Sequence, residues 1–222
     1  MSTLRVKICG ITRPEDALLA CELGADAIGF IFYRPSPRYI SPQKAFEISR
    51  QLPEHVARVG VFVEEDDRFI FHVAQEVPLD VIQFHGNHSP AFMQPFQGYR
   101  RIKAFRVRHS LDAAHLAAYR DVADAFLLDT YRQGQFGGTG VSFDWKLAQP
   151  IRKAFRLILA GGLNATNVRQ AVETVKPYGI DVSSGIESAP GRKDAKKMRT
   201  FFEQVEALRD HDKTSHHRFP CS

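Results

Sequence analysis

Cys9 is the residue with the clearest potential for acid–base or nucleophilic chemistry, because it ends a short apolar run, Leu4–Ile8. If that run is a strand, side-chain alternation places Lys7 and Cys9 on one face and the apolar side chains on the other. A thiol becomes a base or nucleophile only where its pKa is lowered. Lys7 and Arg5 lie deeper on the same face and are candidates for lowering that pKa from a distance. A buried structural cysteine fits the position equally well.

Asp129 ends a second apolar run, Ala125–Leu128, in the same way. A carboxyl group held partly away from water keeps its proton and can act as a general acid, although a helix or loop cap is the plainer alternative. Gln83 and His85 close the run Val81–Phe84 and share one face. We expect them to contact or position a substrate.

Two arginines in the loop after the run Ala27–Phe32 are candidates for binding a carboxylate. Arg34 and Arg38 alternate there with two prolines, which stiffen the backbone. A fixed arginine can hold a carboxylate through two parallel hydrogen bonds. Spacing alone does not choose between them, and a solvated basic loop remains the alternative.

Two turns late in the chain are suited to phosphate. Gly161 and Gly162 close one apolar run, and Ser184 and Gly185 follow the last one. We expect each turn to open toward a helix, where backbone amides bind anions without a charged side chain. The pair of turns is stronger evidence than either alone, since barrel enzymes commonly bind phosphate after strands seven and eight.

Asp181 lies inside the last apolar run, and we expect it either to pair with Lys7 or to touch a sugar hydroxyl. The glycine-rich segment 134–140 follows Asp129 along the chain. It is predicted to be either a cover that closes on a ligand or a plain flexible loop.

The elements that must position these residues alternate regularly between two periodicities. Short apolar runs alternate with longer amphipathic segments, eight of each, which predicts parallel strands joined by helices. We therefore predict an α/β fold, a single (β/α)8 TIM barrel with parallel strands, whose active site lies at the carboxyl ends of the strands. The alternative, an open doubly wound sheet, lacks its Gly-x-Gly-x-x-Gly signature after the first run. The predicted strands are Leu4–Ile8, Ala27–Phe32, Arg58–Val63, Val81–Phe84, Arg101–Phe105, Ala125–Leu128, Leu157–Ala160 and Ile180–Val182, and the predicted helices are Pro14–Leu23, Pro42–Leu52, Asp66–Gln75, Pro90–Phe96, Ser110–Tyr119, Phe143–Pro150, Ala165–Val175 and Asp194–Leu208.

Composition sets the broad class of protein. The 222 residues are 44% hydrophobic and 25% charged, which is typical of one globular domain. We assign residues 1–208 to the barrel and expect the polar tail, 209–222, to be disordered. The net charge of +5 comes from basic residues spread along the chain without a nucleic-acid-binding motif, so we expect no nucleic-acid partner but an anionic small substrate. The densest basic cluster, Arg192–Arg199, is interpreted as the start of a helix.

Cysteine usage and hydropathy indicate a reducing compartment. Three cysteines without paired or metal-ligand spacing argue against a disulfide framework and a structural zinc site. The N-terminus lacks an export-type apolar run, and no apolar stretch is long enough to cross a membrane. We expect a cytoplasmic protein with no membrane partner.

Taken together, the spaced motifs resemble those of the phosphoribosylanthranilate isomerases, a family of tryptophan biosynthesis. The resemblance covers about residues 4 to 208, and its specificity lies in the number and order of the motifs. They are Lys7–Thr12, Gly29–Phe30, Arg38–Ser41, Gln83–Gly86, Leu128–Asp129, Gly137–Gly140 with Phe143–Trp145, Ala160–Asn164 and Asp181–Glu187.

The resemblance implies a barrel and a reaction. The reaction is the Amadori rearrangement of N-(5-phosphoribosyl)anthranilate, a phosphorylated amino-sugar, to 1-(2-carboxyphenylamino)-1-deoxyribulose 5-phosphate, with no cofactor and no metal. By resemblance, Cys9 is the general base, Asp129 the general acid and Arg38 the ligand of the anthranilate carboxylate. This chemistry requires a protonated acid and a deprotonated base, so we expect the site to raise the pKa of Asp129 and to lower that of Cys9. A monomer or a homodimer is expected.

Three other functions compete with this one. Another phosphosugar isomerase of the barrel class, of the histidine-pathway or dual-substrate type, would use an aspartate pair, against which Cys9 argues. A metal-dependent epimerase needs clustered ligands, and His85 alone is too few. A barrel that serves only as a binding scaffold would be expected to have lost Cys9, Asp129 or the glycine turns.

Overall fold

Short runs of mainly β-branched and aromatic residues form eight strands that pair in parallel and close into a barrel. The structure is a computed structural model, and it describes residues 4–107, 112–130 and 145–209. Strand order follows chain order, with β8 pairing β1 to close the ring, so the predicted fold class is confirmed. The strands are β1 (Arg5–Cys9), β2 (Ala27–Ile31), β3 (Ala57–Phe62), β4 (Val81–Phe84), β5 (Arg100–Val107), β6 (Ala125–Thr130), β7 (Leu157–Leu159) and β8 (Gly179–Val182).

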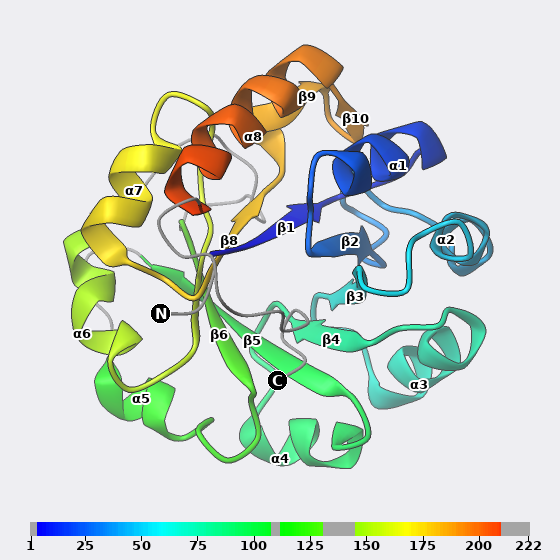
Figure 1. Ribbon diagram of the computed structural model, residues 1–222. Helices are drawn as coiled ribbons and strands as arrows, with labels where there is room; N and C mark the ends of the chain where they lie inside the picture. The colour runs from blue at the N-terminus through cyan, green and yellow to red at the C-terminus, as the bar shows by residue number, and fades with distance from the viewer. Residues whose placement is uncertain (1–3, 108–111, 131–144, 210–222) are drawn as a thin grey trace.

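Helices follow the strands and form a ring around the barrel (Figure 1). Several begin at residues that the sequence marks as caps: Ser41, Asp66 and Ser89 each accept a hydrogen bond from the first turn of the helix that follows. The helices are α1 (Pro14–Glu22), α2 (Pro42–Ser49), α3 (Asp67–Glu76), α4 (Pro90–Met93), α5 (Ala113–Ala117), α6 (Gln149–Arg152), α7 (Val168–Val175) and α8 (Ala195–Arg209), with 3₁₀ turns η1 (Gln94–Phe96), η2 (Trp145–Ala148) and η3 (Ser184–Ile186).

Side-chain alternation along the strands divides the core into two layers. Inward-facing side chains are mostly small, such as Ala57, Val59 and Ala104, because the inside of an eight-stranded barrel is narrow. Outward-facing side chains are larger, such as Phe84 and Phe126, and pack beneath the helices. This inner layer of small apolar side chains fills much of the barrel below the carboxyl ends of the strands.

An aspartate repeated before alternate strands aligns the opposite end of the barrel. Asp26, Asp80 and Asp124 precede β2, β4 and β6, and each carboxylate accepts a backbone N–H from the start of the preceding strand at 2.7–2.8 Å. Each of these aspartates also donates its own backbone N–H to the same residue of that strand. These contacts fix the strand starts and lie far from the carboxyl ends, which fits a role in stability.

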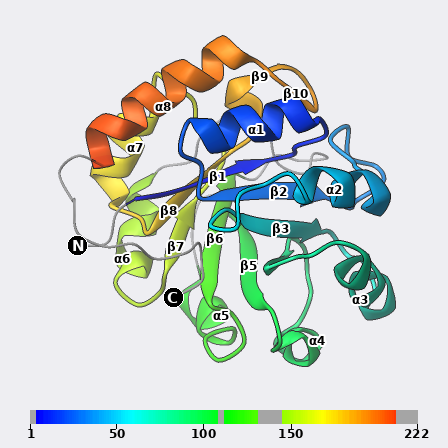
Figure 2. The same cartoon turned by 45° about the vertical axis from the view of Figure 1, so that its right-hand side comes forward.

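A short hairpin between β8 and α8 is the main departure from the predicted elements. The cluster Arg192–Arg199 was predicted to begin a helix, and that prediction is wrong at its start. Strand β9 (Glu187–Ala189) pairs antiparallel with β10 (Arg192–Lys193), and α8 begins only at Ala195 (Figure 2). The physical reason is the turn at Pro190 and Gly191, where Gly191 adopts φ +78, which glycine favours.

Three predictions fall on segments outside the described residues: the glycine-rich segment 134–140, the motif 137–140 with 143–144, and the tail 210–222. The domain boundary at 208 therefore stays a prediction. Within the described residues, none of the helices has the length and apolar character needed to span a lipid bilayer.

Candidate active site

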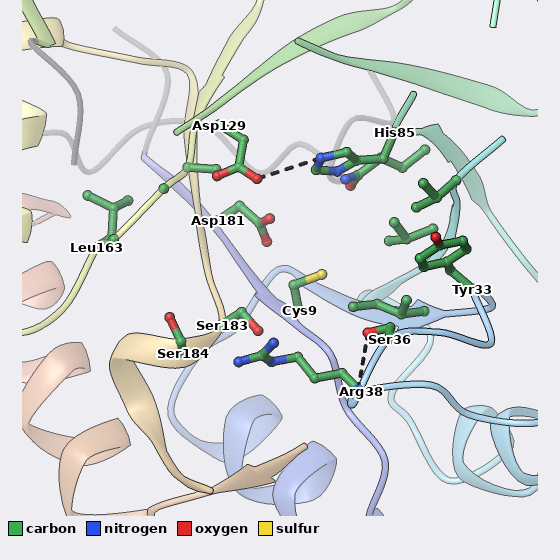
Figure 3. Close-up of a pocket in the computed structure, with 17 residues that line it drawn as sticks. Cys9, Tyr33, Ser36, Arg38, His85, Asp129, Leu163, Asp181, Ser183 and Ser184 are labelled. Atoms are coloured by element: carbon green, nitrogen blue, oxygen red, sulfur yellow. Dashed lines mark hydrogen bonds and ion pairs between the residues drawn. The ribbon is translucent and has the colours of Figure 1, made fainter. Parts of the chain in front are cut away.

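A cavity of about 710 Å³, partly open to solvent, lies at the carboxyl ends of the strands. Nine of the ten residues that the sequence singles out line it, so residues distant in sequence converge on one site (Figure 3). They are Cys9, Arg38, Gln83, His85, Asp129, Gly161, Gly162, Asp181 and Ser184. The tenth, Gly185, follows the lining residue Ser184 but is not itself part of the lining, and Arg34 is exposed and outside it.

Cys9 faces the cavity from the end of β1, and its side chain is only 6% exposed. We expected its surroundings to lower the pKa of the thiol, and that prediction is wrong for the free protein. Burial raises the pKa of Cys9, and this effect outweighs the attraction of the nearby Lys7 ammonium. Arg5 does not assist, because it pairs with Asp26 at the other end of the strand.

Lys7 lies below Cys9 on the inward face of β1, as alternation predicts. Its amine donates a hydrogen bond to Asp181 on β8 at 2.9 Å, so the predicted pairing of these two residues is confirmed. Burial alone would lower the pKa of Lys7, but Asp181 and Cys9 together raise it. The amine therefore stays protonated while fully buried.

Asp129 faces the same cavity from β6, with 5% of its surface exposed. Its Oδ2 lies 3.6 Å from Nε2 of His85, beyond hydrogen-bond distance (Figure 3). Burial and the neighbouring cations lower the pKa of His85 to about 3. The imidazole is therefore neutral near pH 7 and adds no positive charge beside the carboxyl group.

Two buried polar atoms in the wall of the cavity lack hydrogen-bond partners among the described residues. These are Oε1 of Gln83 and Nε2 of His85. Unpaired buried polar atoms are costly, so a site that presents two of them toward a cavity is suited to a ligand with its own polar groups. Both positions were predicted as substrate contacts from their shared face on β4.

Arg38 extends across the mouth of the cavity and is held by the β9–β10 hairpin. Its Nε donates to Glu187 Oε1 at 2.9 Å, and its Nη2 donates to Oε2 at 2.7 Å. Lys193 donates to the same carboxylate at 2.9 Å and to the backbone carbonyl of Cys9 at 2.6 Å. The attraction of Arg38 and Lys193 outweighs burial and lowers the pKa of Glu187, so the carboxylate stays ionised.

The sequence analysis missed the positioning role of Glu187 and Lys193. The signal that would have found them is the Pro190-Gly191 turn, which marks a hairpin and not a helix start. A hairpin would have brought its two flanking charged residues together at the end of β8.

The two glycine turns also contribute to the lining of the cavity, through Gly161, Gly162 and Ser184. Gly161 and Gly162 adopt φ +82 and +70, which explains the need for glycine at both. Gly185 is required for space, because a Cβ there would overlap the carbonyl oxygen of Leu163. We expected each turn to open toward a helix. Helix α7 follows the first turn at Val168, and the second turn leads into the 3₁₀ turn η3, with the β9–β10 hairpin before α8.

This fold and site define a class of protein: a (β/α)8-barrel enzyme whose cavity at the carboxyl ends of the strands is lined by a thiol, carboxyl groups, an arginine and glycine turns. Within the described residues, no three His, Cys, Asp or Glu side chains are grouped so as to hold a metal ion.

Comparison with known proteins identifies the family. The model of the N-(5'phosphoribosyl)anthranilate (PRA) isomerase family matches residues 6–204. An N-(5'-phosphoribosyl)anthranilate isomerase from Geobacter sp. (strain M21) is 48% identical over 204 residues, covering 92% of this chain and 98% of that relative. The crystal structure of phosphoribosyl anthranilate isomerase from Thermotoga maritima matches with a TM-score of 0.86 and 45% identity, covering 92% of this chain and 100% of that one.

A further solved structure is that of phosphoribosyl anthranilate isomerase in complex with reduced 1-(o-carboxyphenylamino)-1-deoxyribulose 5-phosphate. It matches with a TM-score of 0.83 and 44% identity over 92% of this chain and 100% of that one. The chain belongs to the N-(5'-phosphoribosyl)anthranilate isomerase family and is an isomerase of tryptophan biosynthesis.

Proposed function

We propose that this site rearranges N-(5-phosphoribosyl)anthranilate to 1-(2-carboxyphenylamino)-1-deoxyribulose 5-phosphate, with Cys9 as general base and Asp129 as general acid. The observation that carries the assignment is that a buried thiol on β1 and a buried carboxyl on β6 face one cavity. Arg38 and the two glycine turns surround that cavity with groups suited to a carboxylate and a phosphate, the two anionic ends of this substrate.

The reaction begins at the furanose oxygen. The Asp129 carboxyl gives its proton to that oxygen as the bond from the oxygen to C1′ breaks, and the nitrogen lone pair forms a C1′=N bond. The Cys9 thiolate then takes the proton from C2′, and the C–H electron pair forms a C1′=C2′ bond while the C1′=N pair returns to nitrogen. The resulting enolamine tautomerises to the ketone: the C2′ hydroxyl loses its proton as the C2′=O bond forms, and the C1′=C2′ electron pair takes a proton at C1′. Each positioned proton-transfer group typically contributes about 10²–10⁴-fold to such a reaction.

Substrate orientation depends on the anionic ends. Arg38 is already aligned by Glu187 through Nε and Nη2, and its remaining N–H groups on Nη1 and Nη2 are suited to the anthranilate carboxylate. The turns at Gly161, Gly162 and Ser184 are suited to the phosphate. Gln83 and His85 present unpaired polar atoms to the sugar between them.

Turnover of freshly prepared phosphoribosylanthranilate, followed by the loss of its anthranilate fluorescence, tests this function. We expect rapid loss with the wild-type chain and only the spontaneous rate with Cys9→Ser. If the wild type gives no more than the spontaneous rate, the proposed substrate is wrong, and other phosphorylated sugars become the candidates.

Glu187→Gln is expected to weaken substrate binding more than it slows chemistry. The amide removes the charge that aligns Arg38, so its guanidinium is free to leave the carboxylate-binding position. Hydrogen bonds to charged groups contribute about 1.5–3 kcal/mol, which corresponds to a rise in KM of about 10- to 100-fold. Steady-state kinetics would measure it, with Glu187→Asp as the conservative control. An unchanged KM would remove Glu187 from the alignment of Arg38.

Gly185→Ala is expected to weaken phosphate binding because the added methyl overlaps the Leu163 carbonyl and displaces the turn after β8. We expect KM for substrate and the inhibition constant of inorganic phosphate to rise together. Gly98→Ala is the matched control, since a Cβ at Gly98 meets no atom within 4 Å. If the inhibition constant does not move while KM does, the turn binds some other part of the substrate.

We also propose that the enzyme acts in the cytoplasm on this small substrate alone, as a monomer or a homodimer. One similar solved structure, with a TM-score of 0.82, is of monomers derived from dimeric phosphoribosylanthranilate isomerase of Thermotoga maritima, which supports both assembly states. Sedimentation of the full chain would distinguish them.

A further inference from the structure

The Lys7 ammonium lies deep in the barrel, 0% exposed, directly beneath the cavity that Cys9 faces. A buried ammonium is costly unless it is paired, and Lys7 donates a hydrogen bond to Asp181 at 2.9 Å. Lys7 and Asp181 are also register partners in the pairing of β1 with β8. The barrel therefore holds a charge pair one layer below the thiol, and no step of the proposed reaction uses it.

Gly29 on β2 brings this amine and the Cys9 thiol together. Gly29 is the register partner of Cys9, and a Cβ built on it would lie 3.1 Å from both Sγ of Cys9 and Nζ of Lys7. Both atoms therefore press against the same point of the neighbouring strand. The φ of Gly29 is not in the left-handed region, so glycine matters here for space: a Cβ would crowd both the thiol and the lysine amine.

We propose that Lys7 is a positioning residue that holds the Cys9 thiolate by charge, and that Asp181 and Cys9 compete for its ammonium. The proposal rests on the proposed role of Cys9 as the base. In the free protein Asp181 has the stronger hold on the ammonium, which keeps the buried lysine paired. When the thiol loses its proton to water, the new negative charge is shared with the same ammonium.

Each charge around Cys9 shifts the pKa of the thiol in a definite direction. Burial raises the pKa of the thiol most, Lys7 lowers it, Asp181 raises it, and Lys193, which is bonded to the Cys9 carbonyl, lowers it slightly. Further titratable or charged groups face the same cavity, and every variant compared below retains them. They are Tyr33, Arg38, His85 and Asp129.

Titration of the Cys9 thiolate in the free enzyme tests the proposal without any need for turnover. The ultraviolet absorbance of the thiolate is followed against pH, and the same variant carrying Cys9→Ser is subtracted so that the other cysteines cancel. The set is the wild type, Asp181→Asn, Lys7→Met and the double variant, with circular dichroism to confirm folding. Lys103→Met is the matched control, a buried lysine that does not contribute to the electrostatics of Cys9.

We expect Asp181→Asn to ionise Cys9 at lower pH than the wild type, and Lys7→Met at higher pH. Each displacement should be about 1 to 3 pH units, as for an opposite or like charge within a few ångströms. In the double variant, the pH at which Cys9 ionises should lie between those of the wild type and Lys7→Met, because Lys7 affects Cys9 more strongly than Asp181 does. The Cys9 pKa in the pH profile of kcat/KM should move with each titration, and Lys103→Met should match the wild type.

Coincident curves, or displacements of both single variants in one direction, would overturn the proposal, since a merely structural pair has no reason to act with opposite signs. If Lys7→Met does not fold, Asp181→Asn and the double variant still decide, because they must lie on opposite sides of the wild type. Failure of the proposed function is seen separately: it would appear as normal turnover in Cys9→Ala, whatever the titration shows.

Discussion

Cys9→Ala is expected to lower kcat by about 10²–10⁴-fold while substrate affinity stays within a few-fold of the wild type. The methyl group cannot take the C2′ proton, but the groups assigned to the carboxylate and phosphate are untouched. The side chain is small and lies at the edge of the inner layer, so the fold should tolerate the change. Single-turnover kinetics measures the chemical step, and competition by a reduced product analogue measures binding.

Cys21→Ser is the control for the loss of a thiol as such. Cys21 lies on α1, half-buried beside the core and outside the cavity, and burial raises the pKa of its thiol to about 11. Its loss should leave kcat unchanged. Normal turnover in Cys9→Ala would show that another group takes the C2′ proton, and a large rise in KM with normal kcat would reassign Cys9 to binding.

The alternation of strands and helices was enough to predict the barrel and the convergence of the site. Period-two alternation puts Lys7 and Cys9 on the inside of β1, and the same rule puts Gln83 and His85 on the inside of β4. Once a closed parallel barrel is assumed, the carboxyl ends of all strands meet at one mouth. Polar residues at those ends, such as Asp129, therefore share a cavity whatever their distance in sequence.

What the sequence could not predict depends on contacts between distant segments. The pKa of Cys9 reflects a balance between burial and Lys7, and neither the depth of burial nor the position of the amine can be derived from a linear pattern. The contacts that Glu187 and Lys193 make with Arg38 and Cys9 arise only because the β9–β10 hairpin folds back over the mouth. The local sequence at Arg192 indicated the start of a helix instead.

The two ends of the barrel divide stability from chemistry. At the amino ends, Asp26, Asp80 and Asp124 accept backbone N–H groups and so fix where the strands begin. At the carboxyl ends, Gln83 and His85 carry buried polar atoms without hydrogen-bond partners among the described residues, which costs stability. The hydrogen bonds at the amino ends therefore stabilise the barrel, and the carboxyl ends can hold polar groups whose hydrogen-bond partners a bound ligand supplies.

Asp129→Asn is expected to lower kcat by about 10²–10⁴-fold, with little change in substrate affinity. The amide has the shape of the carboxyl group, but it has no acidic proton to give to the furanose oxygen, so the ring stays closed. His85 cannot replace it, because its pKa of about 3 leaves the imidazole neutral and without an acidic proton near pH 7. Burst kinetics on phosphoribosylanthranilate would measure the loss in the chemical step.

Asp124→Asn is the control, because Asp124 precedes the same strand at its other end. Its carboxylate accepts the backbone N–H of Arg101 at 2.7 Å, so its replacement should lower the free energy of unfolding by about 1–3 kcal/mol while kcat stays normal. Opposite effects are therefore expected at the two ends of β6. Replacement of Asp129 lowers kcat without lowering the free energy of unfolding, and replacement of Asp124 lowers the free energy of unfolding without lowering kcat. A variant of Asp129 that unfolds more readily but still turns over normally would make that carboxyl a structural cap and would leave the furanose oxygen without a proton donor.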